Sequence, residues 1–413
     1  MFKSPAVEFH MSKKSILFIH KNFPAQFGTL GKWLSTQGWD VTFATKRKVV
    51  GHQGFRVVQF ANKRDITKGV HRYLAGTEGA IIEGQGFART GIVLANEGYR
   101  PDIVVAHSGW GVGTFAKDVW PDAKFVSYAE WWYQWPAVDR SPHDTPDKEP
   151  VDARARTRVR NTPMLLDLMA SDAILCPTRF QADQFPKIWQ DQMTVMHDGI
   201  DTDLNSPGPP SADLRSELGI PAEGKTLTFV ARGMEPQRGF PEAMQAASIL
   251  MQRNSNLHFV VVGEDRVAYG NRAKVDSWKA KMLAELDFDE SRLHFTGLVP
   301  RNKLVDVFRL SDAHLYLSTP FVLSWSVLDA MSCGCHVVAA KSAATEEFIQ
   351  SGMNGDMVSV SETGEIVQAV ENAMSDEIRS KTIRSNARST IVDNVSISGI
   401  FPQKEAFFGA LIG

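Results

Sequence analysis

The segment from Ala313 to Ala340, AHLYLSTPFVLSWSVLDAMSCGCHVVAA, carries groups that suit a nucleotide ligand. Ser324 is a typical N-cap for a helix of roughly ten residues. Free backbone N–H groups around Val322, Leu323 and Ser324 would lie at the positive end of the helix dipole, where a phosphate is stabilised. Asp329 follows about one and a half turns later, within reach of a sugar hydroxyl of the same ligand. These groups predict a nucleotide site. The alternative is that Ser324 only caps the helix.

The residues on either side of this helix indicate a βαβ unit. Two short apolar runs, 314–317 and 336–340, are typical of buried strands. Gly334 suits the end of the helix between them. The N-terminus of such a helix lies at the carboxyl end of the preceding strand, which is where open α/β sheets bind ligands.

The same alternation of strands and helices fills both halves of the chain, and the proline-rich stretch 207–210 indicates a linker between them. Two such series predict an α/β protein of two Rossmann-like, doubly wound domains facing a cleft. Residues 139–156 are charged and contain prolines, which favours a mobile surface segment, with a helix from Arg158 onward. Strands are expected at 15–20, 41–44, 102–106, 125–128, 173–176, 193–196, 227–231, 258–262, 293–296, 314–317 and 336–340.

Length and composition exclude several classes of protein. A chain of 413 residues is too long for one ordinary core. Its net charge of -2 gives no support to a nucleic-acid surface. An odd number of cysteines, two of them in apolar surroundings, favours buried reduced thiols. Because no run of about 18 apolar residues occurs, we expect a cytoplasmic protein, either free or peripheral at the inner face of the membrane. Met11 fits a second start, with residues 1–10 as a disordered leader.

Four phrases in the first half carry a family resemblance: KNFPAQF (21–27), RPDIVVAHSGWG (100–111), PTRFQ (177–181) and HDGIDTD (197–203). Together with the second half, they make the chain similar to the retaining GT-B glycosyltransferases of family 4. The resemblance implies transfer of a sugar from a nucleotide sugar to a hydroxyl of a glycan, lipid-linked or protein acceptor. It implies no metal and no cofactor beyond the donor.

The resemblance also implies a division of the chain. It predicts an N-terminal acceptor-side domain at 12–206 and a C-terminal nucleotide-sugar domain at 220–394. The last helix, about 398–413, is expected to cross back onto the first domain. Phe407 and Phe408 give that segment an apolar face for this contact.

In the second half, the resemblance assigns roles to single residues. Arg232 and Arg238 match a basic pair that grips the diphosphate, and Asp329 matches the acid that binds the ribose. The family has a paired acid eight positions before Asp329, where this chain has Phe321. Glu347 resembles a donor-side acid. We expect replacement of Asp329 to weaken donor binding and to leave unfolding nearly unchanged.

In the first half, His107 resembles a histidine that touches the donor sugar, and the alternative is a histidine that only caps a strand. Gly28 would let the first loop approach the phosphates. Trp110 and Trp131 fit either sugar stacking or core packing, and Glu130 among them is an acceptor-side acid candidate.

Other interpretations stay open at this level. The sequence between 201 and 203, Asp-Thr-Asp, looks like a metal motif of another glycosyltransferase fold, but its position before the linker argues against a metal site. A GT-B sugar-nucleotide epimerase would need further acid and base carboxylates. A catalytically inactive sugar-nucleotide-binding protein is suggested by the missing acid at Phe321.

Overall fold

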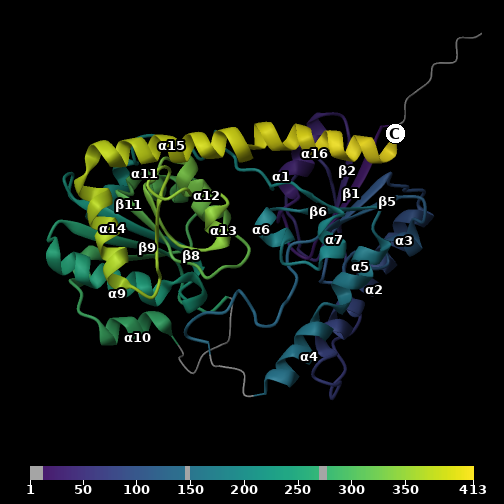
Figure 1. Cartoon of the computed structure of the whole chain (residues 1–413). Coiled ribbons are helices and arrows are strands. Elements are labelled where there is room, and N and C mark those ends of the chain that lie inside the picture. The colour runs from purple at the N-terminus through teal and green to yellow at the C-terminus, as the bar shows by residue number, and fades with distance from the viewer. Residues whose placement is uncertain (1–12, 145–148, 269–276) are drawn as a thin grey trace, which may run out of the picture.

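The computed structural model describes residues 13–144, 149–268 and 277–413 of the chain. Expected features before residue 13, including the leader and the start at Met11, lie outside the described residues. Figure 1 shows two α/β units side by side, with the last two helices running along both. Each unit contains one parallel sheet, so the two predicted Rossmann-like sheets are confirmed.

The first unit contains a seven-stranded sheet in the order β3-β2-β1-β4-β5-β6-β7. Its strands are β1 Ser15–Ile19, β2 Asp40–Thr45, β3 Arg56–Gln59, β4 Ile103–His107, β5 Lys124–Tyr128, β6 Ala173–Cys176 and β7 Met193–Val195. Its helices are α1 Gly28–Thr36, α2 Ala75–Asn96, α3 Ala116–Val119, α4 Pro150–Arg160, α5 Thr162–Ala170, α6 Arg179–Ala182 and α7 Lys187–Gln190.

The second unit contains a six-stranded sheet in the order β10-β9-β8-β11-β12-β13. Its strands are β8 Lys225–Gly233, β9 Leu257–Glu264, β10 Leu293–Gly297, β11 Ala313–Tyr316, β12 Val337–Ala340 and β13 Asp356–Val358. Its helices are α8 Ala212–Glu217, the short 3₁₀ turn η1 Pro236–Arg238, α9 Phe240–Arg253, α10 Trp278–Glu285, the 3₁₀ turn η2 Glu290–Arg292, α11 Arg301–Leu310, α12 Trp325–Ser332, α13 Ala343–Glu346, α14 Thr363–Ser375 and α15 Glu377–Val395, after which α16 spans Ile397–Ile412.

Two edge strands and the start of α4 are among the differences from the sequence-based expectation. The strands β3 and β13, which we did not predict, lie at the edges of their sheets. An edge strand has one unpaired side, so it can be short and half-exposed without the continuous apolar run that marks a central strand. The segment expected to be mobile at 139–156 contains the start of α4, where Pro150 occupies the first turn. Residues 145–148 lie outside the described residues.

Each sheet reverses its strand order once, and the reversal fixes where a ligand can bind. In the first sheet it falls between β1 and β4, and in the second between β8 and β11. All strands paired at these points are parallel. The loops that leave them therefore diverge above and below the sheet and open a crevice at the carboxyl edge.

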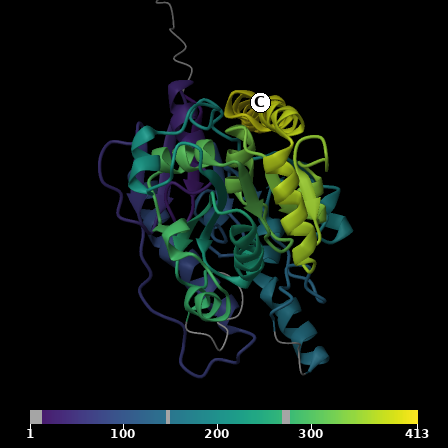
Figure 2. The same cartoon turned by 90° about the vertical axis from the view of Figure 1, so that its left-hand side faces the viewer.

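The C-terminal helices connect the two units. Buried side chains of α15 pack beside α12 in the second unit. Helix α16 then contributes Ile400, Phe401 and Phe408 to the core of the first sheet, where the Phe408 ring lies edge-on to Phe18 at 6.4 Å. Figures 1 and 2 show this long helical segment lying across one side of the molecule. None of the helices in the described ranges is both long and apolar enough to cross a bilayer.

Replacement of Phe408 by Ala is expected to lower the free energy of unfolding by about 3–5 kcal/mol, because it removes a buried ring from the first core. Denaturant unfolding of the full chain measures the loss. Ile378→Ala is the control, since Ile378 on α15 is 83% exposed and should change stability by less than about 0.5 kcal/mol. Equal losses in both variants would contradict the packing of α16 on the first sheet.

Candidate functional site

Polar and aromatic side chains gather at the reversal point of the first sheet. His20 follows β1, His107 ends β4, and Glu130 lies two residues after β5. Because β1, β4 and β5 are neighbours in the sheet, these side chains form a row along its carboxyl edge. His20 has no counterpart among our sequence-based candidates. Its position at the end of a buried apolar run, the same position as that of His107, is the sequence signal that could have identified it.

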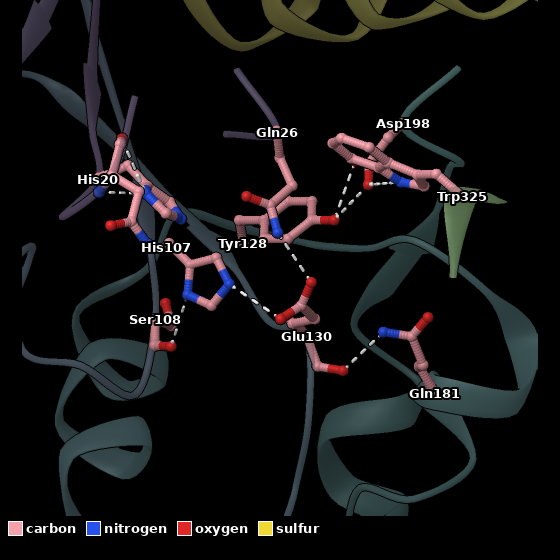
Figure 3. Close-up of polar contacts among 10 residues, drawn as sticks. His20, Gln26, His107, Ser108, Tyr128, Glu130, Gln181, Asp198 and Trp325 are labelled. Carbon is pink, nitrogen blue, oxygen red and sulfur yellow. Dashed lines mark hydrogen bonds and ion pairs between the residues drawn. The ribbon is translucent and has the colours of Figure 1, made fainter. Parts of the chain in front are cut away.

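His107 is the centre of this row, and Figure 3 shows its partners. Its Nε2 lies 3.2 Å from Oε2 of Glu130, and its Nδ1 lies 3.2 Å from the carbonyl oxygen of Ser108. The ring also stacks on Trp110, with centroids 4.1 Å apart. Each ring nitrogen therefore has a polar partner, Glu130 or the Ser108 carbonyl, that accepts a hydrogen bond when that nitrogen carries a proton.

The charges and hydrogen bonds around Glu130 favour the ionised form of its carboxyl. Burial opposes ionisation of Glu130, but the charge of His107 and the hydrogen bonds from His107 and Gln26 outweigh it and lower the carboxyl pKa. Gln26 Nε2 donates to Glu130 Oε1 at 2.8 Å. Burial and the neighbouring His107 lower the pKa of His20 to about 3, so that ring is neutral at pH 7.

Two of the phrases in the first half contribute hydrogen-bond partners of Glu130 in this row. Gln26 belongs to the first loop, where Gly28 begins α1. A Cβ at Gly28 would lie 2.4 Å from Cβ of Pro24, so packing within the loop already requires a glycine there. From the PTRFQ phrase, Gln181 Nε2 donates to the backbone carbonyl of Glu130 at 2.7 Å (Figure 3). Neither contact with Glu130 was expected from the sequence.

The loops of the two units meet beside this row. The carboxylate of Glu347 accepts hydrogen bonds from the backbone N–H groups of Arg179 and Phe180, at 2.7 and 2.8 Å. Trp131, which is 6% exposed, packs against Phe321 with ring centroids 4.7 Å apart. Glu347, which we expected on the donor side, therefore caps the first turn of α6 across the interface. Phe321, where the family has an acid, makes an apolar contact between the units.

A buried polar network forms a second contact between the units. Asp198, from the HDGIDTD phrase, accepts hydrogen bonds from the Tyr128 hydroxyl at 2.9 Å and from Trp325 Nε1 at 3.2 Å (Figure 3). Lys404 of α16 lies 3.6 Å from the same carboxylate. Burial raises the pKa of Asp198 and lowers that of Lys404. Because Trp325 is the first residue of α12, this network fixes the start of that helix relative to the first sheet.

At the reversal point of the second sheet, Arg232 is exposed near the end of β8, and Arg238 is half-buried in η1. The loop after β11 lies against η1, since the Thr319 N–H donates to the Gln237 carbonyl at 3.0 Å. The two arginines and the start of α12 therefore belong to loops from adjacent strands, β8 and β11. This is the arrangement that a diphosphate site would need.

The expected role of Ser324 at this helix start needs a correction. Its Oγ accepts from the Ser326 N–H at 3.3 Å, as an N-cap does. Its own N–H donates to the Tyr316 hydroxyl at 3.1 Å and is therefore not free for a phosphate. The half-buried Val322 and the buried Leu323 precede it in the loop. Their backbone N–H groups remain candidates for phosphate binding.

Asp329, the expected ribose-binding acid, is 1% exposed in the structure. Its Oδ1 accepts from Asn205 Nδ2 at 2.8 Å and from Arg301 at 2.9 Å. Burial raises the pKa of Asp329 to about 6, although Arg301 opposes the rise. Its replacement is therefore expected to change stability, contrary to our expectation from the sequence.

Residues 37–204 match the family described as Glycosyl transferase family 4 group, and residues 211–390 match the family described as Glycosyl transferases group 1. These matches cover both α/β units. The chain belongs to the GT-B glycosyltransferases of family 4.

Among curated relatives, the D-inositol 3-phosphate glycosyltransferase of Acidothermus cellulolyticus is 24% identical over 52% of this chain and 48% of its own length. That of Corynebacterium glutamicum is 30% identical over 41% of this chain and 40% of its own. This family 4 chain thus spans about half the length or less of these curated relatives.

Solved structures resemble the whole fold. HepE of Anabaena, in complex with UDP and glucose, aligns with a TM-score of 0.72 at 18% identity, over 96% of this chain and 100% of that one. Sucrose-phosphate synthase of Thermosynechococcus elongatus aligns with a TM-score of 0.72 at 14% identity, over 97% and 99%. At such identities the likeness shows the GT-B fold.

Asp329→Asn is expected to gain stability relative to the native protein as pH rises from 4 to 7. A carboxyl whose folded-state pKa is raised contributes stability below its unfolded pKa and loses it as pH rises through the folded value, here about 6. The displacement corresponds to about 3 kcal/mol. Denaturant unfolding at several pH values measures the difference, and Asp312→Asn, which also removes a carboxylate near β11, is the control. A difference independent of pH would contradict the buried, protonation-sensitive state of Asp329.

Proposed function

We propose that this protein transfers a sugar from a nucleotide-diphosphate sugar to a hydroxyl acceptor, with retention of the anomeric configuration. The observation that carries the proposal is the direct contact between loops from the carboxyl edges of the two sheets. Glu347 joins α6 to the second unit, and each unit has one reversal point in its own sheet. A donor held on the second edge would present its sugar to groups on the first.

The second edge would hold the nucleotide. Arg232 and Arg238 would neutralise the diphosphate as negative charge develops on the departing β-phosphate, which is where catalysis gains most from fixed positive charge. The backbone N–H groups of Val322 and Leu323 would add hydrogen bonds near the start of α12. Asp329 would approach the ribose through its second carboxylate oxygen, because Oδ1 is already bonded to Asn205 and Arg301.

The first edge would position the sugar and the acceptor. His107, held by Glu130, would face the sugar, and Trp110 would offer a ring face beside it. Glu130 is occupied by His107 and Gln26, which makes it a positioning residue for His107 rather than a free acid for the acceptor. Trp131 is occupied by Phe321 and fits packing better than sugar stacking.

Retention is supported by the same occupancy. Glu130 is held by two hydrogen bonds, so it is a poor candidate for a nucleophile that forms a covalent intermediate. In a front-face transfer the bond between the anomeric carbon and the phosphate oxygen breaks while the acceptor oxygen bonds from the same side. The acceptor proton passes to the leaving phosphate. No side chain then has to serve as general base.

We place the reaction in glycan or glycoconjugate assembly in the cytoplasm, free or at the inner face of the membrane. Two alternatives differ in their products. An epimerase would turn over donor without an acceptor, and an inactive protein would bind donor without any turnover. Incubation with UDP-glucose and other nucleotide sugars, with and without a panel of hydroxyl acceptors, separates the three. Donor consumption that requires an acceptor and gives a retained linkage is the expected result.

Arg232→Ala and Arg238→Ala are each expected to lower kcat by about 100-fold or more, as removal of a charge-stabilising donor does. Arg253→Ala is the matched control, because Arg253 is an exposed arginine of the same unit paired with Glu371. Steady-state kinetics at saturating donor measure the effect. Wild-type turnover in either site variant would exclude the diphosphate assignment.

Chelation is expected to leave transfer unchanged, because the arginine pair takes the role that a divalent ion has in other glycosyltransferases. The measurement compares initial rates in EDTA and in added Mn²⁺. Asp201 Oδ1 accepts from the Leu204 N–H in a turn before the linker. Loss of activity in EDTA that manganese restores would revive the Asp201–Asp203 segment as a metal site.

A further inference from the structure

Two lysines converge on one buried carboxylate at the edge of the first sheet. Lys21 follows β1 and Lys46 follows β2, and their Nζ atoms lie 3.4 and 2.9 Å from Oε1 of Glu83. Glu83 comes from the middle of α2 and is 8% exposed, whereas each lysine side chain is 32% exposed. Glu83 thus holds both ammonium groups in place, and both keep access to solvent.

This cluster, which we call the lysine pair (Lys21 and Lys46 on Glu83), carries an excess of positive charge. Burial opposes ionisation of Glu83, but the hydrogen bond from Lys46 and the charge of Lys21 lower its pKa, so the carboxylate is charged at pH 7. Arg47 lies beside it and bonds the neutral Asn22 side chain. Two lysines, Arg47 and one carboxylate give a net charge of about +2.

The facing groups do not cancel this charge. His20 is neutral at pH 7, since its pKa is lowered to about 3. Glu130, the next carboxylate along the edge, is occupied by His107. One lysine is enough to neutralise the charge of the buried Glu83 carboxylate. The second lysine therefore has ammonium hydrogens available for an anion.

The lysine pair is also tied rigidly to the candidate reaction site. Lys21 Nζ lies 5.7 Å from the centroid of Trp110, the ring on which His107 stacks. The loop carrying Trp110 packs tightly against α2, because a Cβ at Gly111 would lie 2.0 Å from the Ala80 carbonyl and one at Gly84 would lie 2.6 Å from the Gly111 carbonyl. Glu83 and Trp110 are each adjacent to one of these glycines, so their separation is fixed.

The order of strands places the lysine pair next to His107 along the edge of the first sheet. Lys46 follows β2, Lys21 follows β1 and His107 ends β4, and these three strands are consecutive in the sheet. Neighbouring strands are about 4.8 Å apart. We propose that the lysine pair binds the phosphate group of a phosphorylated acceptor, whose hydroxyl then lies beside His107. The inference rests on the proposed transferase function and names its acceptor class.

Direct binding of inorganic phosphate to the full chain tests the site without catalysis. Isothermal titration is expected to show binding that weakens about tenfold or more in Lys21→Gln and in Lys46→Gln, since each removes a charge-assisted contact. Lys48→Gln is the matched control, because Lys48 is an exposed lysine of the same loop as Lys46. Equal weakening in the control would overturn the proposal in favour of general charge attraction.

Glu83→Gln separates binding from a structural role. If the lysines bind the phosphate, removing the negative charge of Glu83 should tighten phosphate binding by about threefold to tenfold. If they serve only to neutralise Glu83, phosphate affinity stays unchanged while thermal stability shifts, and the proposal fails. Thermal unfolding of each variant shows whether it is folded.

Transfer assays give the second arm. Phosphate-bearing acceptors should have a higher kcat/KM than their dephosphorylated forms, and Lys21→Gln should remove that preference through KM. A preference for carboxylate-bearing acceptors, such as uronic acids, would overturn the phosphate assignment. Transfer to neutral acceptors alone would refute the lysine pair and leave the transferase intact, whereas phosphate binding without any transfer would refute the transferase alone.

Discussion

Parallel strands send every following loop to the same edge of a sheet, and both candidate binding edges of this protein depend on that constraint. His20 and His107 come from strands that are neighbours in space but are separated by more than eighty residues in the chain. Arg232 and the loop before α12 are related in the same way. Functional residues that lie far apart in the sequence are brought together at the point where each sheet reverses its strand order.

The two edges are held together by a small number of polar contacts. Glu347 accepts two backbone N–H groups from α6, and Asp198 accepts from Tyr128 and Trp325. Buried charges are costly to desolvate, and removal of one partner leaves the other uncompensated. These contacts therefore specify one placement of the units more than they add stability. Lys404 extends that specification to the C-terminal helix, since it supplies the positive charge beside Asp198.

Charge is graded along the first edge in a way that suits an anionic substrate. Excess positive charge lies just after β2 and β1, and the hydrogen-bonded pair of His107 and Glu130 lies at the ends of β4 and β5. The positive end is solvent-accessible, while His107 is 3% exposed. An anionic group would be recognised at one end of the row, and the reacting hydroxyl would be directed to the other. Tight backbone packing at Gly84 and Gly111 keeps the two ends at a fixed distance.

The sequence by itself determined the central strands, the helix start at Ser324 and the two-sheet class, because buried parallel strands and N-caps leave local patterns. The phrases around His107 and the basic pair were enough to indicate the family. Only the tertiary structure decided the partners: the edge strands β3 and β13, the burial of Asp329, and the capping of α6 by Glu347. Glu347 lies 168 residues from Arg179 in the chain. Such contacts are set by how whole sheets and helices pack, and no local periodicity encodes them.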